Sequence, residues 1–218
     1  MDKSFIYYEL IEALNRPGCS VCALIERHSL EHIEAVFYES VNDPETRSRL
    51  RSSFGFCKHH AEIAVRIGSP LAFALIYEDV LNALDKAIAR SARTGRVVSS
   101  VKCLLCEQEL QQESRLIQAL ATSLEEEEMQ CAYKISAGLC AHHLIRLITA
   151  CSLPIRQLVV EVERERIREL RDELMDLIRK NDYRFAKEAI GKEGDSWLRA
   201  ISKVAGRSIE RKGILNSG

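Results

Sequence analysis

The chain has 218 residues, of which 46% are hydrophobic and 29% are charged, a composition typical of a globular protein. Its formal net charge of −1 offers no general attraction to nucleic acid or to an anionic membrane. No stretch approaches the roughly 18 apolar residues of a membrane span, and the N-terminus lacks the pattern of a signal peptide. Eight cysteines are too few for a secreted disulfide scaffold. We therefore expect a cytoplasmic protein without a membrane partner, and nucleic-acid binding is not favoured.

Apolar residues recur every three to four positions through nearly the whole chain, and no run alternates with period two, which predicts an all-α fold. Gly and Pro residues divide the pattern into segments. The helices expected in the first half span about 3–15, 19–41, 44–54, 57–67 and 70–93. Those expected in the second half span about 104–121, 123–135, 140–150 and 154–180.

The most informative motif is a repeated pattern of Cys and His residues. Two C-x-x-C pairs and two C-x-x-H pairs alternate along the chain: Cys19 and Cys22, Cys57 and His60, Cys103 and Cys106, Cys140 and His143. The C-x-x-C pairs are 84 residues apart (103 − 19) and the C-x-x-H pairs are 83 apart (140 − 57). The matched separation predicts an internal duplication of a helical unit.

Each half of the chain contains the four Cys and His ligands of a tetrahedral zinc site. We expect one ion on Cys19, Cys22, Cys57 and His60, and a second on Cys103, Cys106, Cys140 and His143. His60 and His143 follow a cysteine at i+3, on the same helix face, so they are preferred as ligands over His59 and His142, which are expected beside the sites or at the surface. Four protein ligands close the coordination sphere and predict a structural role. An iron–sulfur cluster on the same ligands is the alternative.

The repeat predicts two tandem helical units, residues 1–93 and 103–181, with a joint at 94–102 and a C-terminal arm at 182–218. One compact domain containing all of them is the alternative. The arm has no counterpart in the first half, and it combines aromatic, Arg and Asp residues. Tyr183, Arg184 and Trp197 are its candidate contacts for a ligand or partner; docking of the arm by its aromatic side chains is the other interpretation.

Two further features have unremarkable structural interpretations. Cys131 and Cys151 lie outside both motifs and are expected to fill the core as small apolar side chains. Apolar residues at heptad-like spacing after Pro154 would suit a homodimer, but Glu163 interrupts the seam, so packing on the body of the protein is favoured.

Several segments together resemble a prokaryotic family of unknown function. They are Gly18-Cys19-Ser20-Val21-Cys22, Val41-Asn42-Asp43-Pro44, Gly55-Phe56-Cys57-Lys58-His59-His60, the second cysteine set, Asn181-Asp182-Tyr183-Arg184-Phe185 and Gly194-Asp195-Ser196-Trp197. The resemblance extends over nearly the whole chain and implies a bacterial or archaeal cytosolic protein. It implies no reaction, substrate or catalytic residue.

The sequence contains no Gly-rich phosphate loop, no H-E-x-x-H and no nucleophile elbow. It therefore favours a zinc-stabilised helical scaffold or adaptor that binds another protein over an enzyme. Two alternatives remain open. One is a metal or redox sensor that uses the Cys₃His sites, and the other is a small-ligand binder or enzyme that uses residues 183–197.

Overall fold

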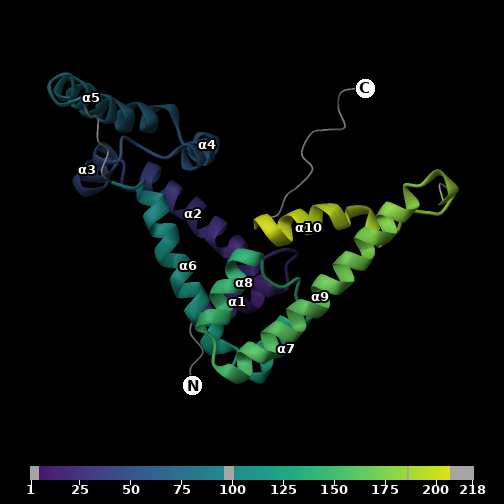
Figure 1. The fold of residues 1–218 in the computed structure, drawn as a ribbon. Coiled ribbons are helices and arrows are strands. Elements are labelled where there is room, and N and C mark those ends of the chain that lie inside the picture. Colours follow the sequence, from purple (N-terminus) through teal and green to yellow (C-terminus); the bar gives the residue numbers. More distant parts are fainter. Residues whose placement is uncertain (1–4, 96–100, 186, 207–218) are drawn as a thin grey trace. The chain divides into compact units, whose positions relative to one another are not determined.

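The computed structural model describes residues 5–95, 101–185 and 187–206. Within these ranges the chain forms α-helices and two short 3-10 helices, and it contains no strand (Figure 1). The all-α prediction is therefore confirmed.

The described part of the first half forms five helices, whose ends follow local capping chemistry. They are α1 (Phe5–Leu14), α2 (Ser20–Tyr38), α3 (Pro44–Ser52), α4 (Lys58–Ile67) and α5 (Pro70–Thr94). Asp43 caps α3 by accepting a 2.7 Å hydrogen bond from the Thr46 amide, and Ser69 accepts one of 3.2 Å from Ala72 at the start of α5. Both helices have Pro at the first position, where its missing N–H has no structural cost.

The second half repeats this order and adds a C-terminal arm. Its helices are α6 (Leu104–Ser123), α7 (Glu127–Ile135), α8 (Ala141–Ala150), α9 (Leu153–Lys180), the 3-10 helices η1 (Tyr183–Phe185) and η2 (Lys192–Asp195), and α10 (Ser196–Ala205). Helix α7 begins four residues later than the sequence pattern predicts, because α6 continues to Ser123 and the following Leu124 is completely buried.

The chain forms two compact units, each built from both halves of the sequence. The first unit comprises Met1–Leu24 and Ser114–Gly218, and the second comprises Ile25–Glu113. The two boundaries fall inside α2 and α6, the long helices labelled in Figure 1. These bounds are not those of the sequence repeat, because each half of the chain contributes to both units.

The core of the second unit lies among α2, α3, α4, α5 and the start of α6. Its buried side chains include Ile33, Phe37, Leu50, Ile76 and Leu105. Helix α3 packs on α5, where Asp79 accepts hydrogen bonds from Arg47 Nε at 2.7 Å and Arg51 Nη1 at 2.9 Å. Burial of large apolar side chains supplies most of the stability of such a helical unit.

In the first unit, α1 packs on α7, α8 packs on α9, and α10 lies against both α8 and α9. The largest fully buried side chains include Leu10, Leu120, Tyr133 and Met129. The buried side chains of α9 are Ile155, Val159 and Glu163: Val159 is completely buried and Glu163 is only 1% exposed, whereas Ile167 on the heptad-like seam is 40% exposed. Glu163, which interrupts the apolar seam in the sequence, is therefore an internal residue.

None of the helices in the described ranges is both long and apolar enough to cross a membrane.

Candidate metal centres

The first Cys/His cluster belongs to the first unit and joins the start of α2 to the start of α8. It contains Cys19, Cys22, Cys140 and His143. The Nδ1 atom of His143 lies 3.3 Å from the sulfur of Cys19, 3.3 Å from that of Cys22 and 3.2 Å from that of Cys140. The sulfurs of Cys22 and Cys140 are 3.8 Å apart. Four soft donor atoms therefore surround one point.

The second cluster belongs to the second unit and joins the start of α4 to the start of α6. It contains Cys57, His60, Cys103 and Cys106. The Nδ1 atom of His60 lies 3.2, 3.7 and 3.4 Å from the sulfurs of Cys57, Cys103 and Cys106, and Cys57 and Cys106 are 3.6 Å apart at sulfur.

Both clusters rest on the same local structure. Cys57 is the N-cap residue of α4 and Cys140 is the N-cap residue of α8, with φ near −65° and −69°. Each histidine follows three residues later in the first turn, so that its ring reaches back to the cysteine sulfur. The C-x-x-C pairs likewise begin helices, with Ala23 N bonded to Cys19 O and Glu107 N to Cys103 O. The positive ends of four helix dipoles thus favour thiolates at the clusters.

The donor spacing fits a single tetrahedral metal ion. Bonds of about 2.3 Å to sulfur and 2.0 to 2.1 Å to nitrogen give tetrahedral edges of about 3.5 to 3.8 Å. The donor separations given above run from 3.2 to 3.8 Å in the two clusters. All eight cysteines are free thiols, including these six. Each cluster therefore has the donor set and the size to hold one metal ion.

The pairing of the motifs differs from the tandem pairing that the sequence repeat suggests, and that expectation is wrong. The C-x-x-C of the first half lies beside the C-x-x-H of the second half. The C-x-x-C of the second half lies beside the C-x-x-H of the first half. Helix length provides the physical reason, since α2 has 19 residues and extends about 24 Å beyond Cys22 before the chain reaches Cys57. Helix α6, of 20 residues, separates Cys106 from Cys140 in the same way.

Hydrogen bonding within the clusters changes the pKa of several ligands. Burial alone would lower the pKa of His60, but hydrogen bonds to Cys103 and Glu109 raise it to about 10. Burial would also lower the pKa of His143, but hydrogen bonds to Cys140 and Cys22 raise this pKa to about 9. Burial opposes ionisation of Cys103, yet the hydrogen bond from His60 and bonds from backbone amides lower its pKa to about 6. A metal ion binding here displaces these shared protons, so its affinity falls in acid.

Glu109 adds a contact behind the second cluster that the sequence analysis missed. Its Oε1 atom lies 3.0 Å from His60 Nε2 and accepts a 2.7 Å hydrogen bond from Ser29 Oγ. A carboxylate at the far nitrogen of a metal-binding histidine fixes the ring orientation and keeps the proton on Nε2. The signal was present in the sequence, because Glu109 stands three residues after Cys106 on the same helix face.

The alternative histidines lie outside the predicted donor sets. His59 is half-buried, within reach of His60 and Glu109, and His142 is exposed on α8. Arg16, three residues before Cys19, forms an ion pair with Glu12.

Glu163 organises the loop that carries Cys140. Its buried Oε1 atom accepts hydrogen bonds from Tyr133 Oη at 2.6 Å, Leu139 N at 3.1 Å and Arg166 Nη1 at 2.9 Å. Burial and the adjacent carboxylate raise the pKa of Tyr133 well above its usual value. The loop passes so close that a Cβ atom on Gly138, whose φ is +78°, would lie 2.4 Å from Glu163 Oε1. Glycine is therefore required at this position.

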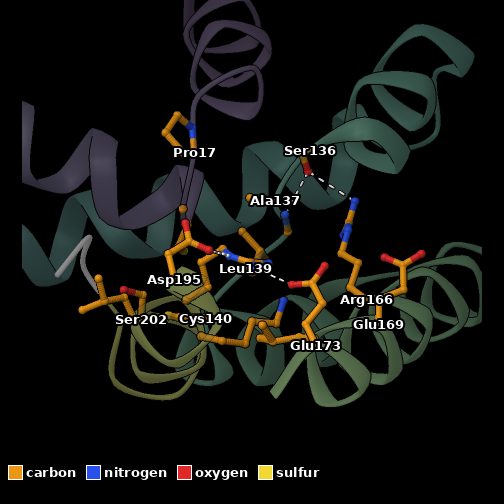
Figure 2. A pocket seen from close by; sticks show the side chains of 17 residues that line it. Pro17, Ser136, Ala137, Leu139, Cys140, Arg166, Glu169, Glu173, Asp195 and Ser202 are labelled. Atoms are coloured by element: carbon orange, nitrogen blue, oxygen red, sulfur yellow. Dashed lines mark hydrogen bonds and ion pairs between the residues drawn. The ribbon is translucent and has the colours of Figure 1, made fainter. Parts of the chain in front are cut away.

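A pocket of about 420 Å³ lies beside the first cluster, between the Ser136–Cys140 loop, α9 and α10. Figure 2 shows Arg166, Glu169 and Glu173 from α9 on one side and Asp195 and Ser202 on the other. Its charges largely satisfy one another: Arg199 pairs with Glu173 and Asp195, and Arg166 pairs with Glu163. Opposite charges therefore hold the arm against α9.

The three arm residues predicted as contacts do not converge on this pocket. Tyr183 is 87% exposed, Arg184 forms a 2.6 Å ion pair with Asp182, and Trp197 lies on the outer part of α10. The arm is attached instead through polar side chains such as Glu193, which pairs with Lys180 at 2.7 Å.

The two remaining cysteines differ in burial. Cys151 is buried at the end of α8, as predicted. Cys131 is exposed on α7, so the prediction that it fills the core is wrong. Met129, Ala132 and Tyr133 form the buried face of this helix, which leaves position 131 on the outer side.

The architecture is that of an all-α protein with two Cys₃His clusters, and comparison with known proteins places it in a family. The model of a family of unknown function (DUF6062) matches residues 1–211, and the chain belongs to this family. An uncharacterized 23.9 kDa protein in the xynA 3′ region of Caldicellulosiruptor sp. (strain Rt8B.4) is similar, with 27% identity over 202 residues, 90% of this chain and 99% of that protein. No solved structure matches the chain.

Proposed function

We propose that this protein is a zinc-stabilised helical scaffold that binds another protein. The observation that carries the proposal is the closed donor set of each cluster, three cysteine sulfurs and one histidine nitrogen around a single point. Four protein ligands leave no coordination position for a substrate, as is typical of structural zinc. Each ion would hold together helix starts that are distant in the sequence, so its binding energy adds to folding.

The donor distances support zinc over an iron–sulfur cluster. In a cluster with several irons the protein ligands bind different metal atoms and so stand further apart than around one ion. Separations of 3.2 to 3.8 Å fit ligands that share one ion. Three thiolates and an imidazole in a tetrahedron are a frequent ligand set of structural zinc.

An exposed apolar stripe on α10 supports the protein-binding part of the proposal. Trp197, Ile201 and Val204 are 38, 43 and 73% exposed, and their spacing places them on one face of the helix. Such a stripe on an amphipathic helix is typical of surfaces that pack against a partner.

Metal stoichiometry in paired double variants tests the zinc sites and their ligand sets together. C57S/C103S changes two ligands of the same cluster, so this variant should retain one zinc ion per chain. C57S/C19S changes one ligand in each cluster and should retain none at high affinity. Elemental analysis and absorption spectra of the purified proteins measure both outcomes. A brown protein that contains iron would contradict zinc, and the reverse stoichiometry would contradict the ligand sets.

Site-specific photo-crosslinking in the native cell tests the partner. A crosslinking residue at Ile201 should repeatedly capture the same protein, whereas one at Glu165, on the exposed side of α9, should not capture it. Equal capture from both positions, or none from Ile201, would contradict binding through α10.

A further inference from the structure

Helix α10 ends directly on the first cluster. Gly206 is the C-cap residue of α10, with φ of +76°, and it is buried. A Cβ atom on Gly206 would lie 3.3 Å from Cys22 Sγ and 3.4 Å from Cys140 Sγ. The backbone at the end of the arm thus lies against two of the four metal-ligand sulfurs, at a distance that suits glycine best.

An ion pair fastens α10 to the body of the first unit one turn before this contact. Lys203 donates through Nζ to Glu163 Oε2, and both side chains are largely buried. The other oxygen of Glu163 accepts from the Leu139 amide, next to the ligand Cys140. One buried carboxylate therefore joins the arm to the metal-binding loop.

Detachment of α10 would expose the cluster. The helix contributes Leu198, Arg199, Ser202 and Lys203 to one wall of the pocket whose other walls include Cys19 and Cys140 (Figure 2). With α10 in place, Cys19, Cys140 and His143 are buried and Cys22 is half-buried. Without it, the pocket would become an open surface with the sulfurs at its base.

We infer that α10 is a cover for the metal site formed by Cys19, Cys22, Cys140 and His143, held closed by the Lys203–Glu163 ion pair. This inference rests on the proposed metal binding and adds that α10 limits the release of the metal: an ion leaves this site only after α10 has detached. Local opening of a small packed element is a common step that limits access to a buried site. Glu163 and Lys203 act as positioning residues, since neither is a ligand.

The second cluster offers an internal comparison. The helices α2 to α5 are followed in sequence by α6, and no helix is described between them, whereas α6 to α9 are followed by the arm and α10. Two cysteines of the second cluster, Cys57 and Cys106, are half-buried, against one, Cys22, in the first. The inference therefore predicts that the two ions leave at rates set by different events.

The experiment measures zinc release to excess chelator, with a chromophoric zinc indicator. C57S retains only the first site, and C140S retains only the second. In the C57S background, K203M removes the ammonium group of the Lys203–Glu163 ion pair and keeps an apolar side chain of similar length. Loss of a buried charge-assisted hydrogen bond should raise the release rate at least about tenfold. In the C140S background, K203M should leave the rate unchanged. K187M, which changes an exposed lysine of the same arm, is the matched control and should change neither rate.

Hydrogen exchange identifies the cause of a faster release. In zinc-loaded C57S/K203M, amides of α10 should exchange faster while those of α8 and α9 keep their protection. G206A should act in the same direction, because its new methyl group would crowd the two sulfurs. Release from C57S/K203M at the C57S rate would overturn the cover, as would equal loss of protection in α8, α9 and α10. Absence of tightly bound zinc in the unsubstituted protein would instead refute the proposed metal binding itself.

Discussion

Glu109 illustrates how one residue outside a ligand set can determine the properties of a site. Its carboxylate faces His60 Nε2 at 3.0 Å, while the other ring nitrogen faces the three sulfurs of the second cluster. The position that corresponds in the first C-x-x-C motif, three residues after Cys22, is Ile25. The two C-x-x-C motifs therefore share their cysteines but not the acid three residues later.

We expect E109Q to weaken zinc binding at the second site by about 10- to 100-fold, because the amide holds the imidazole less strongly than the carboxylate. Competition with a calibrated chelator, in the C140S background that retains only this site, measures the change. E62Q on the exposed side of α4 is the matched control and should bind zinc as C140S does. Equal affinity of the two variants would show that Glu109 does not support His60.

The residues of the clusters could be predicted from the sequence because they occur in motifs that appear twice. Each ligand cysteine and histidine stands in a spaced motif, so the clusters contain all eight predicted residues. Glu109 and Glu163 are isolated acids in the sequence, and only packing shows that they meet His60 and Leu139. Cys131 was misplaced because residue type favours burial, whereas its position on the outer face of α7 determines its exposure.

At the scale of helices, α5 and α9 have the same place in the repeat and an acid at the same position. Asp79 and Glu163 are 84 residues apart (163 − 79). Asp79 attaches α5 to α3 through Arg47 and Arg51, whereas Glu163 attaches α9 to the loop before Cys140. In each half of the chain an acid thus anchors the long helix, while its partners differ.

The Asp79 anchor should make stability depend on pH. Partial burial raises the pKa of Asp79, but hydrogen bonds from Arg47 and Arg51 outweigh it and hold the pKa below 3.8. The folded state therefore gains stability from this carboxylate that is complete above pH 3.8 and is lost as the pH falls below the lowered value. Compared with D79N, the wild type should be more stable at about pH 6, and the difference should shrink towards acid.

Urea unfolding of both proteins across this pH range measures the difference; any metal lost in acid would be lost from both, because Asp79 belongs to neither cluster. D85N, which changes an exposed acid on the same helix, should follow the wild type. A gap between wild type and D79N that persists unchanged in acid would show that the charge of Asp79 is not its cause.

Helix positions were largely predictable because they depend on local signals. Pro, Gly and capping residues mark the starts and ends of α3, α4 and α5 in the sequence itself. The start of α7 was harder to predict from the sequence, since it depends on the burial of Leu124 after the end of α6. Packing against other helices overrides the local pattern there.

At the scale of the molecule, the two halves of the chain are interleaved through their two Cys/His clusters. Each cluster takes its C-x-x-C from one half and its C-x-x-H from the other. The motifs could not reveal this arrangement, because matched spacing makes the two C-x-x-H pairs equivalent as partners. The direction and length of α2 and α6 decide which pair each C-x-x-C meets, and those properties emerge only in three dimensions.

Interleaving predicts that neither half can complete a site alone. A chain divided within residues 96–100 yields two fragments, and each contains four of the eight ligands but no complete cluster. Each fragment alone should bind zinc weakly and show reduced helicity, because the unpaired motif lacks the ligands that hold its helices together. An equimolar mixture with zinc should form a complex of both fragments with two ions, measured by native mass spectrometry and circular dichroism.

The same mixture containing C57S in the first fragment should retain one ion, since only the cluster that contains Cys140 remains complete. Tandem pairing would produce the opposite behaviour: each fragment would fold alone around its own ion, and mixing would add neither metal nor helicity. Because the two arrangements share every ligand, this division of the chain separates them where changes to single ligands cannot.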